Sequence, residues 1–85
     1  MDPRYVTDWA AIVGDLRRRG LTFTDLERCT GIARTRLHAF SSYGASPRHD
    51  DGETLIGFWC SFTFSTRDQL PTTSRILNGN ARRQL

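Results

Sequence analysis

The feature that most constrains the fold is the stretch 21–40, LTFTDLERCTGIARTRLHAF, which has a single internal glycine, Gly31. Apolar side chains recur three residues apart on both sides of this glycine, at Leu26 and Cys29 and then at Leu37 and Phe40. Such spacing places side chains on one face of a helix. Gly31 stands where the first helix would end, and glycine adopts the positive φ of a helix C-terminus without strain. The stretch therefore predicts two short helices joined by a tight turn.

Several features of this stretch match a known motif: the opening Leu21-Thr22, Leu26, the turn Gly31-Ile32-Ala33-Arg34-Thr35, and the pair Leu37 and Phe40. In these features the chain resembles the Cro/lambda-repressor-like (XRE-type) helix-turn-helix family of phage and bacterial transcriptional regulators. It departs from the family at Glu27, where a small residue is usual, and at Thr30, where an apolar residue is usual. We expect Glu27 to crowd the contact between the two helices.

The resemblance continues beyond the motif. Pro47-Arg48-His49 and Gly52-Glu53-Thr54-Leu55 are similar to the loop and the next helix of small phage-type regulators, so the likeness covers about residues 8–62. It implies an all-α fold, a compact bundle of four to five short helices around a helix-turn-helix at about 22–41. On this resemblance we expect residues 1–77 to form one helix-turn-helix DNA-binding domain and residues 78–85 to form a flexible tail.

Helix boundaries follow from capping and apolar periodicity. Trp9, Ile12, Val13 and Leu16 form a helical stripe, predicting a helix capped by Thr7 that runs to about Arg19. The second helix starts at Thr22 or at Thr24, and the later frame has a capping box of Thr24 with Glu27. The third runs from about Ala33 to Ser41.

A fourth helix is predicted at about 51–62, capped by Asp50 or Asp51, with capping-box spacing from Asp50 to Glu53. Its apolar stripe consists of Leu55, Phe58, Trp59 and Phe62. The following residues to Phe64 alternate in polarity and suit either a helix end or a short strand. Residues 65–70 form at most one helical turn, because Pro71 stops it.

Size and charge bound the function. A chain of 85 residues has a small core, so an oligomer or a bound ligand would help its stability. The net charge is +3, and all twelve basic residues are arginines. Arginine suits bidentate contacts with phosphate and guanine, although a GC-rich genome also favours arginine over lysine. Cys29 and Cys60 form no metal-binding or disulfide pattern, so both are expected to be small buried thiols. The absence of a signal peptide or long apolar span favours a bacterial host cytosol.

In a helix-turn-helix, the start of the second helix enters the major groove and neighbouring segments contact the backbone. This arrangement nominates four base-contacting residues: Arg34, Thr35, His38 and Ala39. Phosphate contacts are expected from Thr24, Arg36, Tyr43, Arg48 and His49. A homodimer is expected to form through the region 51–70, and its interface residues are Ile56, Trp59, Phe62 and Phe64.

Other chemistry has little support. The cluster His49, Asp50, Asp51 and Glu53 contains metal-ligand types, but helix capping explains its acids more simply. No nucleophile motif, phosphate-cradling glycine loop or convincing catalytic carboxylate pair occurs, so we expect no enzyme, no cofactor and no small-molecule ligand. The predicted partner is double-stranded DNA.

These patterns favour a sequence-specific transcriptional regulator. We expect a phage or mobile-element repressor that acts as a dimer on an inverted-repeat operator and blocks polymerase by occupancy. Two alternatives stay open. One is a DNA-binding packaging or replication accessory factor. The other is a protein-interaction module that uses the helix-turn-helix as a scaffold.

Overall fold

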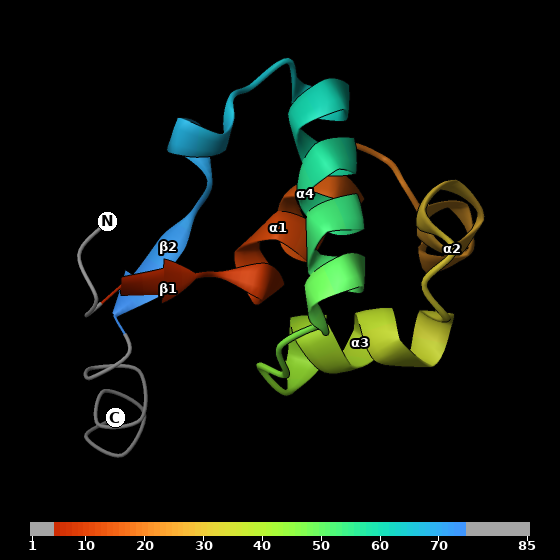
Figure 1. The fold of residues 1–85 in the computed structure, drawn as a ribbon. Coiled ribbons are helices and arrows are strands. Elements are labelled where there is room, and N and C mark those ends of the chain that lie inside the picture. The colour runs from red at the N-terminus through yellow and green to blue at the C-terminus, as the bar shows by residue number, and fades with distance from the viewer. Residues whose placement is uncertain (1–4, 75–85) are drawn as a thin grey trace.

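The computed structural model describes residues 5–74, and in this part of the chain four α-helices and a two-stranded sheet follow one another. Their order is β1 (Tyr5–Thr7), α1 (Trp9–Arg18), α2 (Phe23–Thr30), α3 (Arg34–Ser42), α4 (His49–Thr63), the 3-10 turn η1 (Arg67–Gln69) and β2 (Thr72–Ser74). Figure 1 shows α4 standing over α3, with α2 and the sheet at opposite sides. The predicted all-helical bundle is confirmed, with the addition of the small sheet.

The first helix begins one residue later than expected. Asp8 is its N-cap, and the Asp8 carboxylate accepts a hydrogen bond of 3.0 Å from the backbone N–H of Ala11. The prediction that Thr7 caps this helix is wrong, because Thr7 belongs to β1 and pairs with Thr72. The strand pairing leaves Asp8 as the residue between strand and helix, where its side chain reaches the first turn.

The second helix uses the earlier of its two possible frames. The Thr22 hydroxyl accepts from the Asp25 N–H at 3.0 Å, and the Asp25 carboxylate accepts from the Thr22 N–H at 2.9 Å. This reciprocal capping box replaces the one predicted for Thr24 and Glu27. The helix ends at Gly31, whose φ of 76° confirms the predicted left-handed turn. The third helix then begins at Arg34.

The fourth helix starts without a capping side chain. Its N-cap is Arg48 and no side-chain hydrogen bond is formed there, so the predicted caps from Asp50 or Asp51 are wrong. Both acids lie in the first turn instead, where they complement the positive end of the helix dipole. The helix continues through Thr63, which rules out a strand at 62–64.

The core forms where three helices meet α4. Nine buried side chains make up the main cluster: Ile12, Val13, Leu16, Leu26, Ile32, Leu37, Phe40, Leu55 and Trp59. Trp9 is half-buried against it, and a Cβ added at Gly52 would lie 3.1 Å from the Trp9 ring. A glycine at this point in α4 therefore lets the indole approach the helix backbone.

One polar contact ties the first helix to the fourth. The Trp59 indole N–H donates to Oδ2 of Asp15 at 3.0 Å, across 44 residues of sequence. Asp15 also accepts from Nε of Arg19 at 3.3 Å. The buried indole is thus satisfied at the rim of the core, where a tryptophan N–H needs a partner.

The ends of the described segment meet in the sheet. Val6 pairs with Thr73, and β2 follows η1 and Pro71. The single helical turn predicted before the proline is present as η1. The predicted tail 78–85 lies outside the described residues. Of the two thiols, Cys60 is half-buried and Cys29 is exposed, so the expectation of burial is wrong for Cys29. The second helix reaches the core mainly through Leu26, which leaves the edge with Cys29 in solvent.

The capping box predicts an acid-dependent loss of stability. The backbone hydrogen bond from Thr22 lowers the pKa of Asp25 below its ordinary range, and the Thr22 hydroxyl lowers it further. A carboxylate with a lowered folded-state pKa contributes stability above its unfolded pKa of about 3.9 and loses it as the pH falls through the folded value. We expect Asp25→Asn to flatten the fall in unfolding free energy below about pH 4. Denaturant titrations at pH 2–6 measure it, with Asp68→Asn as the control. An unchanged pH profile would contradict this role for Asp25.

Candidate nucleic-acid interface

The third helix presents two different faces. Leu37 and Phe40 are buried in the core, at 0% and 3% exposure. Arg34, Thr35 and His38 are exposed on the other side of the helix. In Figure 1 the lower side of α3 is covered by no other described element. Of the four residues predicted to contact bases, three are therefore exposed together, while Ala39 is half-buried at the edge of the face.

Arg34 is held by two residues of α2. Its Nε lies 3.1 Å from Oε1 of Glu27, and its Nη1 donates to the Thr24 hydroxyl at 3.4 Å. The side chains of Arg34 and Glu27 remain 58% and 40% exposed. The prediction that Glu27 crowds the contact between the two helices is wrong, because its carboxylate turns to the surface and pairs with Arg34.

His38 lies on an aromatic ring for which the sequence predicted no role. Its imidazole stacks on Phe23, the first residue of α2, with 3.7 Å between ring centroids and 23° between planes. The guanidinium carbon of Arg17 lies 4.6 Å from the centroid of the same ring. This stack joins α1, α2 and α3. Phe23 is half-buried and also packs against the core, so its position in the sequence gives no signal for this stack.

The predicted phosphate contacts divide into two groups. Thr24 and Arg36 are engaged within the protein: Thr24 accepts from Arg34, and Arg36 pairs with Asp51 of α4. Tyr43, Arg48 and His49 are exposed, with Tyr43 at 80%. Tyr43 directly follows α3, Arg48 is the N-cap of α4 and His49 is its first residue. These three side chains therefore lie at the two ends of the loop that joins α3 to α4.

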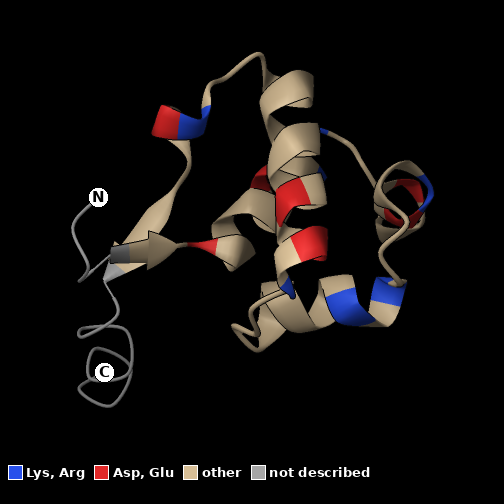
Figure 2. Ribbon diagram, viewed as in Figure 1, with Lys and Arg blue, Asp and Glu red and all other residues tan. Residues whose placement is uncertain are grey.

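Charge on this face is closely balanced. Figure 2 shows the arginines of α3 near the acidic residues at the start of α4. Arg34 pairs with Glu27 and Arg36 with Asp51, while Arg28 lies 3.8 Å from Asp25. Residues 5–74 contain eight arginines and eight acidic residues, so the net charge of +3 comes from Arg75, Arg82 and Arg83. General attraction to phosphate is therefore weak across the described part of the chain.

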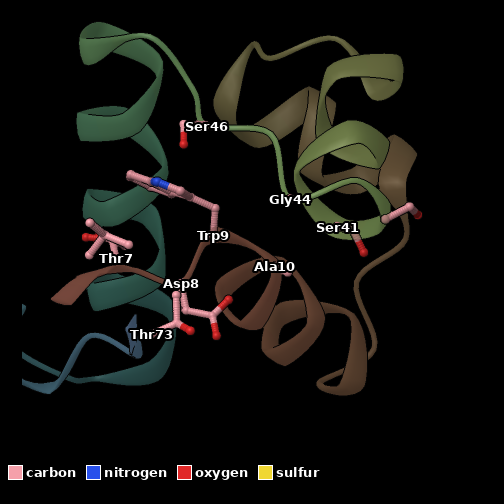
Figure 3. Close-up of a pocket in the computed structure, with 10 residues that line it drawn as sticks. Thr7, Asp8, Trp9, Ala10, Ser41, Gly44, Ser46 and Thr73 are labelled. Atoms are coloured by element: carbon pink, nitrogen blue, oxygen red, sulfur yellow. The ribbon is translucent and has the colours of Figure 1, made fainter. Parts of the chain in front are cut away.

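A hydroxyl-lined cavity of about 220 Å³ lies at the C-terminal end of α3, away from Arg34 at its start. Thr7, Ser41 and Ser46 approach it from three segments, and Asp8 is its one ionisable lining residue within the described chain. Figure 3 shows the Trp9 indole beside it, directed toward α4. No residue of the predicted DNA-contacting set lines this cavity. Among residues 5–74, no group of three His, Cys, Asp or Glu side chains is placed to hold a metal ion.

The predicted dimer residues divide by burial. Ile56 and Trp59 are each only 5% exposed, so both belong to the interior and have little surface for a partner. The expectation that Ile56 lies off the buried stripe is wrong, because the buried face of α4 consists of Gly52, Leu55, Ile56 and Trp59, which recur at helical spacing and leave Phe62 at its edge. Phe62 is 39% exposed and Phe64 is 96% exposed. Phe62 also stacks on Phe58, with 5.6 Å between centroids. Phe58, Phe62 and the C-cap residue Phe64 together form the aromatic end of α4.

Comparisons with known proteins add no relative: no protein-family model, curated protein or solved structure matches the chain. None of the helices in the described part is both long and apolar enough to cross a membrane. The fold and the geometry define a small helical protein in which one exposed helix face is held beside a tight turn.

Proposed function

We propose that this protein is a sequence-specific double-stranded DNA-binding regulator of transcription, similar in plan to the Cro/lambda-repressor-like family. One observation carries the proposal. The left-handed turn at Gly31 sets α3 against α2 so that Arg34, Thr35 and His38 share one exposed side of α3. Helices of this kind enter the major groove, where an arginine can read guanine and a threonine methyl can contact thymine.

The protein would act by occupying its operator on the DNA. With α3 in the groove, the exposed Arg48 and Tyr43 lie at the loop that would run along the backbone. Bound protein would block polymerase and repress the gene beside its operator, in the host cytosol of a phage or mobile element. A homodimer would place two α3 helices about 34 Å apart and favour an inverted repeat.

Binding selection tests the proposal directly. Full-length protein is incubated with random duplexes, the bound fraction is sequenced, and affinities for the recovered and a scrambled duplex are measured between 50 and 300 mM salt (a range in which counterion release is resolved). A regulator enriches one inverted repeat and binds it more tightly than the scrambled duplex at every salt concentration. Recovery of no preferred sequence would overturn the proposal.

The aromatic end of α4 supplies the surface for the dimer. Phe64 combines 96% exposure with a φ of 57°, a left-handed conformation that is unfavourable for a bulky side chain. The left-handed conformation ends α4, with the Phe64 N–H donating to the Cys60 carbonyl, but this cap is strained in a bulky residue and the exposed ring buries nothing in a monomer. Contact with Phe62 and Phe64 of a second copy would remove both rings from water.

This conformation yields a prediction with opposite effects on stability and assembly. Phe64→Gly is expected to raise the unfolding free energy of the monomer by about 0.5–1 kcal/mol, because glycine adopts the left-handed cap without strain. The same change is expected to weaken self-association, measured by sedimentation at micromolar concentration. Tyr43→Ser, which removes the other strongly exposed aromatic ring, is the matched control. Equal association by Phe64→Gly and the parent would place the interface elsewhere.

A second function is favoured by the charge balance. Because Arg34 and Arg36 are already paired with acids and residues 5–74 carry no net charge, the exposed face of α3 has little general attraction for phosphate, which favours a partner other than DNA. In that case the aromatic end of α4 binds a protein and α3 serves as scaffold. Such a module shows no sequence preference in the selection experiment and retains its partner at salt concentrations that disrupt charge attraction.

A further inference from the structure

We infer that Glu27 and Thr24 position Arg34 to read a guanine through its two terminal nitrogens, so that selectivity comes from hydrogen-bond geometry instead of charge. The inference rests on the proposed function and deepens it by naming the base and the residues that prepare its reader. It starts from the departure at Glu27 and from the two contacts by which α2 holds the arginine.

The first step is an inventory of donors. A guanidinium has five N–H groups, one on Nε and two on each terminal nitrogen. Nε lies 3.1 Å from the Glu27 carboxylate, and Nη1 donates one N–H to Thr24. At the end of the guanidinium, two N–H groups on Nη2 and one on Nη1 remain. The Glu27 carboxylate lies beside Nε and obstructs a side-on contact there, whereas a contact through Nη1 and Nη2 is still available to O6 and N7 of guanine.

The second step concerns charge. The Glu27 carboxylate offsets the positive charge of Arg34 where both side chains are about half-exposed. A neutralised arginine gains little from a phosphate, which rewards net charge, but keeps the directional donors that a base edge rewards. The pair therefore suppresses attraction to arbitrary DNA while leaving base reading intact.

The third step concerns the conformational freedom of the Arg34 side chain. An exposed arginine has many rotamers, and ordering it on binding costs free energy. Contacts from two successive turns of α2 hold the Arg34 side chain before DNA arrives. A preorganised side chain loses less conformational entropy on binding. In this proposal Thr24 is a positioning residue, in place of the phosphate contact expected from the helix-turn-helix arrangement.

Two substitutions at one position separate geometry from charge. Glu27→Ala removes both the acceptor and the charge, whereas Glu27→Gln removes the charge and keeps an oxygen that can accept from Nε. The readout is the affinity ratio between the duplex recovered by selection and its scrambled form. We expect Glu27→Ala to lower this ratio about 5- to 30-fold, the scale of one bidentate base contact. Glu27→Gln is expected to retain most of the ratio while binding scrambled DNA more tightly.

Three further measurements complete the test. Replacing the recognised guanine by 7-deazaguanine, which lacks the N7 acceptor, should lower parent affinity and leave Glu27→Ala nearly unaffected. The Arg34 Nε–H resonance of the free protein should be protected from exchange in the parent and unprotected in Glu27→Ala. Thr24→Val, which keeps the shape and removes the hydroxyl, should lower the ratio by a smaller factor than Glu27→Ala.

The possible outcomes are distinct. An unchanged ratio in Glu27→Ala, or equal losses in Glu27→Ala and Glu27→Gln, overturns the positioning role while the regulator proposal stands. Equal unfolding midpoints for parent and variants show that a lost ratio is not a folding defect. If the parent itself prefers no sequence, the proposed function and this inference are both overturned.

Discussion

Leu37→Ala is expected to lower the free energy of unfolding by about 2–5 kcal/mol. Leu37 is fully buried on the inner face of α3, and its removal leaves a cavity among core side chains contributed by the other helices. A domain of this size has a total stability of only about 5–10 kcal/mol, so the variant loses much of it. Far-UV circular dichroism during denaturant titration measures the change, and the folded baseline should shorten or disappear.

Two companions make this result specific. Phe40→Ala, with 3% of Phe40 exposed on the same face, is expected to lose about 3–5 kcal/mol. Thr35→Ala, on the exposed side of the same helix, should change stability by no more than about 0.5 kcal/mol. A Leu37→Ala variant as stable as Thr35→Ala would mean that α3 is rotated about its axis relative to the arrangement described here.

Arg34→Ala is expected to weaken binding to the selected duplex by about 1–3 kcal/mol and to leave binding to scrambled DNA almost unchanged. Because the substitution leaves the Glu27 carboxylate without its arginine, a second comparison is made in a Glu27→Gln background. There the loss of Arg34 removes a base contact without exposing a new negative charge to the DNA. A similar loss of selectivity in both backgrounds assigns the effect to base reading.

Arg48→Ala is the matched control for charge. Arg48 is exposed at the start of α4, beside the loop that would follow the DNA backbone. Its removal should weaken selected and scrambled duplexes alike and flatten the slope of log affinity against log salt by about 1 per protomer. If Arg34→Ala lowers both affinities equally, Arg34 contacts phosphate, and Thr35 with His38 become the main candidates for base reading. If neither substitution changes DNA affinity, the interaction-module function is favoured.

Local chemistry in the sequence was sufficient for the helical framework. The spacing of Leu26, Leu37 and Phe40 identified the buried faces, because side chains three or four residues apart lie together on a helix. Gly31 identified the turn, because a positive φ there strains every residue except glycine and a few others. The same patterns predicted that Arg34, Thr35 and His38 would share an exposed side.

Local chemistry was not sufficient where two solutions had similar energies. Thr22 with Asp25 and Thr24 with Glu27 have the same capping spacing, and in the structure the earlier pair forms the capping box. Once that frame was adopted, Glu27 was free to pair with Arg34. The sequence therefore specified that an acid lies near the arginine-containing helix, while the packing of α2 on α3 decided which acid it contacts.

Long-range contacts decided the rest. Thr7 pairs with Thr72 across the whole domain, and segments of three residues are too short to show the alternation that signals a strand. Ile56 is buried because the face of α4 that packs on the core contains Gly52, Leu55, Ile56 and Trp59, and the neighbouring helices decide which of two overlapping apolar stripes faces inward. The stack of His38 on Phe23 and the pairing of Arg36 with Asp51 likewise depend on how helices approach one another. Sequence determined which surfaces are apolar and where the chain turns, because these are properties of residues and their neighbours. Tertiary structure determined which charges are neutralised and which face stays open, because both depend on distances between separate helices.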